Sequence, residues 1–152
     1  MMRTVLICAA LLLEIRSFTV SPSLASAAEA SPTVICDIQK GPCAATTGNG
    51  LSIQFDITPR PVRAMSELTF HMNISRQGRP VDDAEVTLSL TMPGMYMGKN
   101  QPVVKAIGNG RYEATGIVTR CMSGRKTWQA EVMTKETTSV AGNAASYQFE
   151  AQ

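Results

Sequence analysis

The chain has a single histidine, a single tryptophan and no run of basic residues. A zinc site built from several histidines is therefore excluded, and His71 is the one histidine that could serve a nucleophile as its base. The 14 basic residues stand against 12 acidic ones, which gives a formal net charge of +2. Because the basic residues are scattered along the chain, the charge pattern predicts no nucleic-acid partner.

The sequence also lacks an apolar run long enough to cross a bilayer, and it has no amphipathic helix of useful length. The main apolar run, residues 4–13, is too short to span the hydrocarbon core. It follows Arg3 and precedes small residues that end in an A-x-A pattern at residues 25–27. This order is typical of a secretory signal peptide, so residues 1–27 are predicted to be cleaved. The mature protein is expected to be periplasmic or secreted, without a stable membrane span.

Residue patterns for catalysis are missing as well. Alternation places His71 on the polar face of its expected strand, away from the apolar residues around it. Asp82 and Asp83 follow Pro80 in a turn, where aspartate is common for conformational reasons. The glycines at 108 and 110 precede a strand and indicate a hairpin turn, not a phosphate cradle. The chain is therefore predicted not to be an enzyme.

Alternation of apolar and polar residues with a period of two predicts the fold class. The alternation is clearest over residues 51–57, 68–74 and 86–92, and shorter strands are predicted at 103–107, 112–118, 128–132 and 147–149. Turn-forming glycine, proline and asparagine residues separate these segments. About seven short strands of this kind predict an all-β, immunoglobulin-like β-sandwich over residues 51–152, with Trp128 in its core.

The cysteines are interpreted for an oxidising compartment, since the protein is expected to be exported. Cys36 and Cys43 lie close in sequence, with a Gly-Pro pair between them to turn the chain. We predict a disulfide between them, within a linker over residues 28–50. Cys121 then remains as a lone thiol, although pairing of Cys121 with Cys36 or Cys43 stays an open alternative.

A methionine-rich segment, residues 92–98, is the most unusual feature of the sequence. It has the sequence MPGMYMG and follows a predicted strand, where exposed loops ordinarily carry polar residues. Thioether sulfur is a soft, neutral ligand that selects Cu(I) over zinc, calcium or magnesium. In an antiparallel sandwich this segment and the later turn at Cys121 can lie at the same end. The sequence therefore predicts a Cu(I) site whose candidate ligands are Met92, Met95, Met97, Cys121 and Met122, with His71 outside the set.

Other interpretations of the same residues stay open. Met92 is in phase with the apolar face of its strand, which favours a place in the core, and Met95 and Met97 can cap the open end of the sandwich. Exposed methionines also suit an adaptable protein-binding surface. Cys121 is either an inert buried thiol or a redox-active one, and the redox role predicts an exposed thiol of low pKa.

Three segments resemble the YtkA-like domain family, which is related to FixH. They are residues 91–98 with the methionine segment, residues 110–116 with a Gly-x-Tyr strand, and residues 128–132 with a Trp-x-Ala strand. Residues 56–70 are similar to the opening strands of the same domain. The resemblance implies an exported or membrane-tethered immunoglobulin-like sandwich, and FixH relatives are linked to the assembly of a copper-containing oxidase or to cation transport. A protein partner in a membrane or respiratory assembly is what this resemblance implies.

Overall fold

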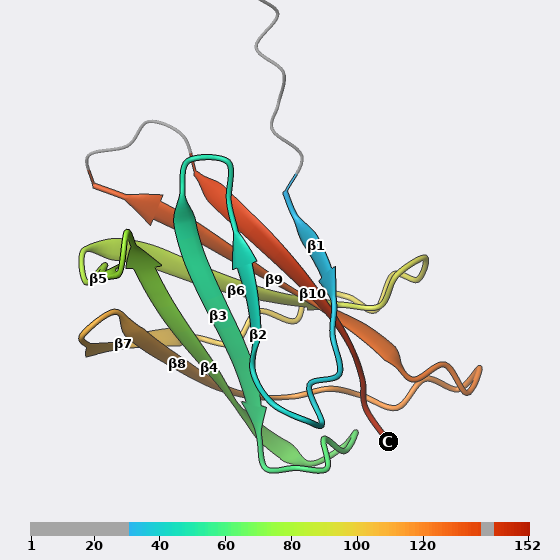
Figure 1. Ribbon diagram of the computed structural model, residues 1–152. Coiled ribbons are helices and arrows are strands. Elements are labelled where there is room, and N and C mark those ends of the chain that lie inside the picture. The colour runs from blue at the N-terminus through green and yellow to red at the C-terminus, as the bar shows by residue number, and fades with distance from the viewer. Residues whose placement is uncertain (1–30, 138–141) are drawn as a thin grey trace, which may run out of the picture.

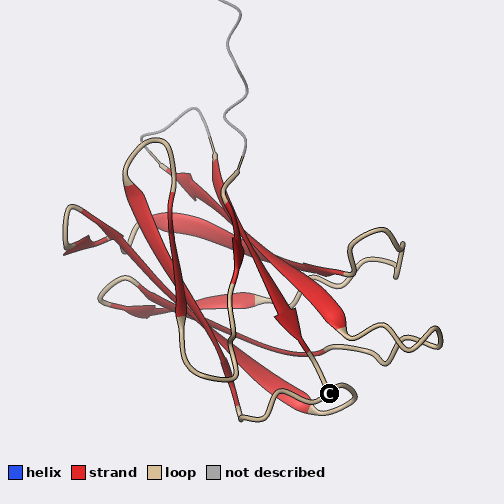
Figure 2. Cartoon of the chain, turned by 45° about the vertical axis from the view of Figure 1, so that its right-hand side comes forward, coloured by secondary structure: helices blue, strands red, loops and turns tan. Residues whose placement is uncertain are grey.

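The computed structural model describes residues 31–137 and 142–152, so the predicted signal peptide over residues 1–27 lies outside the described part. The described residues form two stacked β-sheets (Figures 1 and 2). One sheet has the order β1 (Thr33–Ile35), β10 (Asn143–Glu150), β9 (Thr127–Glu136) and β6 (Ala84–Thr91). The other has the order β2 (Cys43–Thr46), β3 (Leu51–Thr58), β4 (Glu67–Arg76), β8 (Arg111–Ile117) and β7 (Val104–Gly108), with β5 (Arg79–Pro80) paired to β4. The predicted all-β sandwich is confirmed, but it has ten strands instead of seven.

The period-two alternation explains which side chains fill the space between the sheets. On β3 and β4 every second residue is buried and the residues between them face solvent. The facing sheet supplies Leu88, Leu90, Trp128 and Tyr147 to the same core. Trp128 is 1% exposed, which confirms its predicted place in the core. Burial of these apolar side chains is the dominant favourable contribution to folding.

Tyr147 is a polar bridge between the two sheets. Its hydroxyl on β10 donates a hydrogen bond to the backbone carbonyl of Ile53 on β3, at 2.6 Å. Its ring stacks on Phe55, with ring centroids 5.0 Å apart. Burial raises the pKa of the Tyr147 phenol above its ordinary value, so the hydroxyl stays a donor.

Replacing Tyr147 with phenylalanine keeps the ring and removes this hydrogen bond. We expect the free energy of unfolding to fall by roughly 1–3 kcal/mol, because the Ile53 carbonyl is left buried with an unmade interaction. Chemical denaturation followed by circular dichroism measures the change. Tyr96→Phe is the matched control, since Tyr96 is exposed and should give no change. Equal stability of the two variants would contradict the bridging role.

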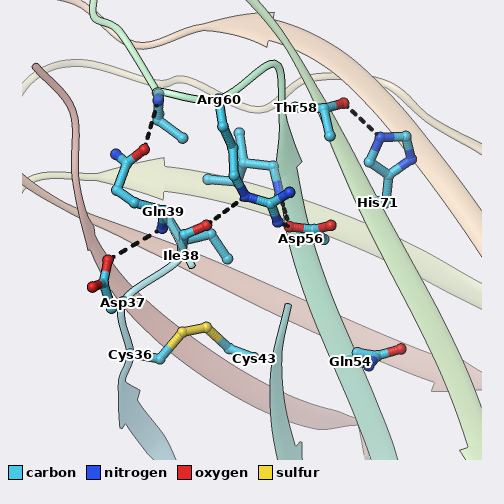
Figure 3. A network of polar contacts seen from close by, with 12 residues as sticks. Cys36, Asp37, Ile38, Gln39, Cys43, Gln54, Asp56, Thr58, Arg60 and His71 are labelled. Atoms are coloured by element: carbon cyan, nitrogen blue, oxygen red, sulfur yellow. Dashed lines mark hydrogen bonds and ion pairs between the residues drawn. A yellow bond between two sulfur atoms is a disulfide. The ribbon is translucent and has the colours of Figure 1, made fainter. Parts of the chain in front are cut away.

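The segment predicted as a linker over residues 28–50 is part of the sandwich from its first described residues. β1 pairs in parallel with β10, and β2 pairs antiparallel with β3. The turn between them buries Ile38, whose carbonyl accepts a hydrogen bond from Arg60 Nε at 2.8 Å (Figure 3). Gln39 accepts a second hydrogen bond from the backbone N–H of Val62, at 2.9 Å. Residues 31–50 therefore contain two short edge strands and a turn that these hydrogen bonds hold in place, where a linker was predicted.

The predicted disulfide between Cys36 and Cys43 is confirmed (Figure 3). It joins the residue after β1 to the first residue of β2, with the two Cα atoms 6.1 Å apart. Each of these strands belongs to a different sheet, so the disulfide links the two sheets at one edge. Closing this turn covalently removes conformational freedom from the unfolded chain.

Candidate functional site

Two loops meet at one end of the sandwich. The loop after β6 carries the methionine segment and the loop before β9 carries Cys121; both project from the right-hand side of Figure 1. The first loop reverses direction in a tight turn, in which the N–H of Met95 donates to the carbonyl of Met92 at 3.0 Å. Gly94 occupies this turn at φ 73°, a conformation that favours glycine. The turn folds Met95 back toward the sandwich.

The central feature of this end is a contact between two sulfur atoms. Cys121 Sγ lies 3.5 Å from Met95 Sδ, and we call these two residues the sulfur pair. Cys121 is 6% exposed and Met95 is partly buried against the core. A turn positions the cysteine, because the N–H of Gly124 donates to the Cys121 carbonyl at 3.1 Å. The sulfur pair is therefore close to the surface and partly shielded from water.

Polar neighbours favour the thiolate form of Cys121. The Ser123 hydroxyl lies 2.9 Å from Cys121 Sγ, and hydrogen bonding from the Ser123 side chain and backbone lowers the pKa of the thiol. The positive charge of Arg125 adds to this lowering, and burial opposes it. A metal ion binds the thiolate and not the thiol, so these neighbours lower the proton cost of binding.

Arg125 also joins the two loops. Its guanidinium Nη1 donates to the carbonyl of Pro93 at 3.3 Å, across from the cysteine loop to the methionine loop. The same nitrogen would lie 3.6 Å from a Cβ atom at Gly94. The contact holds the turn before Met95 next to the turn after Cys121.

The other predicted ligands occupy different positions. Met92 is buried in the core, as its phase in the strand predicts, and Met97 is partly buried against that core. Met122 is fully exposed and lines an open hollow outside Cys121. His71 lies on β4, where Nε2 is 2.8 Å from Thr58 Oγ1 and Nδ1 is 3.1 Å from Glu113 Oε1. The structure thus brings together Met95 and Cys121 of the five predicted ligands.

The hollow also contains Met65, which is missing from the candidates predicted from the sequence. Met65 lies in the loop between β3 and β4, and its backbone N–H donates to the carbonyl of Val118 at 2.8 Å. Since Val118 lies three residues before Cys121, this bond brings the β3–β4 loop next to the cysteine loop. An isolated methionine in a polar turn carries no sequence signal for this long-range contact.

Cys121 also lines a second hollow, of ≈ 350 Å³. Trp128, Ala151 and Gln152 contribute to its wall. Gln152 donates to the Val62 carbonyl at 2.9 Å and accepts from the Ala64 N–H at 2.8 Å, while Ala151 donates to the Lys126 carbonyl at 3.0 Å. These bonds place the end of the chain between the β3–β4 loop and the cysteine loop.

Over residues 31–137 and 142–152, no three His, Cys, Asp or Glu side chains group in a way that could hold a metal ion. Nor does this part of the chain contain a helix with the length and hydrophobicity to cross a membrane.

The fold and this end of the molecule define an all-β sandwich domain with a methionine segment in the loop after β6. The family model described as YtkA-like matches residues 47–133, more than half of the chain, and the chain belongs to the YtkA-like family. The match includes the methionine segment, Cys121 and Met65, whereas the disulfide and β10 lie outside it. No curated protein and no solved structure matched the chain.

Proposed function

We propose that the protein is an exported binding protein that carries one Cu(I) ion between Met95 and Cys121 and catalyses no reaction. The observation that supports this proposal is the 3.5 Å separation of Cys121 Sγ and Met95 Sδ. Two sulfur atoms at this distance can bind the same ion with little movement of the backbone. Their loops are held together by Arg125 independently of any ion.

The chemistry of the two donors fits Cu(I). Thiolate and thioether sulfur are soft ligands, and thioether in particular does not suit calcium or magnesium. Cys121 must lose its thiol proton to bind the ion, whereas the Met95 thioether has no proton to lose. Because hydrogen bonding from Ser123 lowers the pKa of Cys121, less free energy is needed to remove the proton that the ion displaces. The result is a neutral complex of one thiolate with a monovalent cation.

Export is supported by two features. The first 27 residues have the layout of a signal peptide, and Cys36 and Cys43 form a disulfide, a bond that persists in oxidising compartments. The YtkA-like family is related to FixH, whose relatives are linked to the assembly of a copper-containing oxidase or to cation transport. A carrier in such a compartment would meet its partner protein there.

The proposal predicts that the reduced mature protein takes up one equivalent of Cu(I) in competition with a chromophoric chelator. Met95→Leu should weaken this binding by at least roughly 10–100-fold, since loss of a direct ligand should cost as much as loss of an outer-shell partner. The measurement is the chelator absorbance during titration. Met133→Leu is the matched control, because Met133 lies on β9 and is partly exposed. Failure of the wild type to compete with the chelator would refute the proposal.

A second candidate function is protein docking through the same end, without metal. The exposed side chains of Tyr96 and Met122 favour it, since both are apolar and project from the two loops described above. Methionine and tyrosine are enriched at the centres of protein interfaces. This function predicts that Tyr96→Ser and Met122→Ser reduce partner capture while Met95→Leu does not.

A further inference from the structure

An open hollow of ≈ 740 Å³ lies beside the sulfur pair. Its lining includes a residue of the loop between β3 and β4, in addition to residues of the loop that carries Cys121. Five residues line it: Met65, Arg120, Cys121, Met122 and Gly124. Cys121 is thus shared between the hollow and the contact with Met95. Three sulfur-bearing residues from two loops, Met65, Cys121 and Met122, therefore line one hollow, and Cys121 among them belongs to the sulfur pair.

Neither folding nor burial explains a methionine at either position of this rim. Met65 is 64% exposed and Met122 is fully exposed, so neither side chain gains much by removing apolar surface from water. Met65 also adopts φ 62°, a left-handed conformation that glycine or asparagine would adopt at a lower cost. Neither backbone preference nor burial therefore accounts for methionine at position 65.

We infer that Met65 and Met122 form an outer thioether site that receives Cu(I) and passes it through the hollow to Cys121 and Met95. This inference rests on the proposed function, since it assumes that the sulfur pair is the destination of the ion. The outer site would hold the ion by two neutral donors, and the inner site by one thiolate and one thioether. Because a thiolate binds Cu(I) more strongly than a thioether does, the inner site has the higher affinity and the ion moves inward to it.

The transfer is a ligand exchange without a change of oxidation state. Each copper–thioether bond that breaks at the rim is replaced by a copper–sulfur bond at Cys121 or Met95. The thiol proton of Cys121 leaves to solvent as the thiolate binds the ion. No oxidant or reductant takes part, because copper enters and remains as Cu(I).

The charges around the hollow support a short stay at the outer site. Arg120 lines the hollow together with neutral residues, and the lining includes no carboxylate. A positive charge repels any cation, and it repels a divalent ion about twice as strongly as a monovalent one. Binding by soft sulfur donors must therefore overcome this repulsion. The repulsion disfavours zinc or calcium more than Cu(I), and it limits how long Cu(I) stays at the rim.

The outer site can be tested in the absence of the inner one. In Cys121→Ser, we expect Ag(I), used as a redox-stable soft cation, to shift the ε-methyl NMR resonances of Met65 and Met122. The resonance of Met133, a partly exposed methionine on β9, should not move and is the internal control. Unshifted Met65 and Met122 resonances at saturating Ag(I) would overturn the outer site, whatever the wild type does with copper.

The transfer role is tested with the sulfur pair intact. In the Met65→Leu, Met122→Leu double variant, we expect the rate of Cu(I) uptake from a chromophoric chelator to fall about tenfold, with an equilibrium affinity within about twofold of the wild type. Stopped-flow absorbance measures the rate, and Met133→Leu is the control. An uptake rate equal to that of the control would overturn the inference. An affinity loss as large as that of Met95→Leu would also overturn it, because the rim methionines would then be resident ligands.

Discussion

Cys121→Ser is expected to lower the affinity for Cu(I) by at least about 100-fold, the largest functional effect of any single substitution. Serine keeps the size and the hydrogen bonding of the side chain, so the turn that ends at Gly124 should persist. It replaces a soft thiolate by a hard hydroxyl that stays protonated at neutral pH, and Cu(I) discriminates strongly against such a donor. Met95 alone then offers one neutral thioether within the sulfur pair.

The measurement is the same chelator competition used for Met95→Leu, at several pH values. In the wild type, affinity should fall as the pH decreases, since protons compete with copper for the thiolate. In Cys121→Ser this dependence should be lost, because a thioether has no proton to exchange. Equal affinity of wild type and Cys121→Ser would place the copper ion elsewhere, and a retained pH dependence would indicate a different titrating ligand.

Trp128→Ala is expected to cause the largest loss of stability. The indole is 1% exposed and lies opposite Phe149 on the neighbouring strand of its sheet. Removing a buried aromatic side chain costs roughly 3–5 kcal/mol, since the transfer free energy is lost and a cavity remains. Natural domains are stable by only about 5–15 kcal/mol, so this loss is a large part of the total.

Thermal unfolding followed by far-ultraviolet circular dichroism measures this loss. The midpoint should fall by roughly 10–20 °C for a domain of this size. Met133→Ala, on the same strand but partly exposed, should change the midpoint much less. A similar shift in the two variants would show that Trp128 is not a central element of the core.

The sequence predicted the strands whose alternation is strong and missed those that are short. In β3, apolar residues at 51, 53, 55 and 57 leave little doubt about the buried face. β2 buries only Cys43 and Ala45, which are too small to produce a hydrophobic pattern, and β1 has three residues. Such edge strands are determined by pairing with neighbours that are distant in sequence. That pairing is a tertiary property, so the predicted linker over residues 28–50 included both strands.

The candidate site was predicted in part for the same reason. The methionine segment and Cys121 both follow recognisable strands, and in the structure Met95 Sδ and Cys121 Sγ lie 3.5 Å apart. Which sulfur atoms meet depends on turn geometry: the turn at Gly94 directs Met95 to Cys121, whereas Met122 projects into solvent. Met65 was missed because its loop reaches the site through one backbone hydrogen bond to Val118, which leaves no pattern in the sequence.

The backbone of Ala151 and Gln152 connects two loops at this end of the molecule. Their backbone hydrogen bonds reach Val62 and Ala64 in one loop and Lys126 in another, so a single short peptide fastens both. These bonds connect the loop that carries Met65 to the loop that carries Cys121. Ala151 and Gln152 thus hold the two loops together through their backbone. We expect removal of these two residues to loosen both loops, although neither residue offers a sulfur atom.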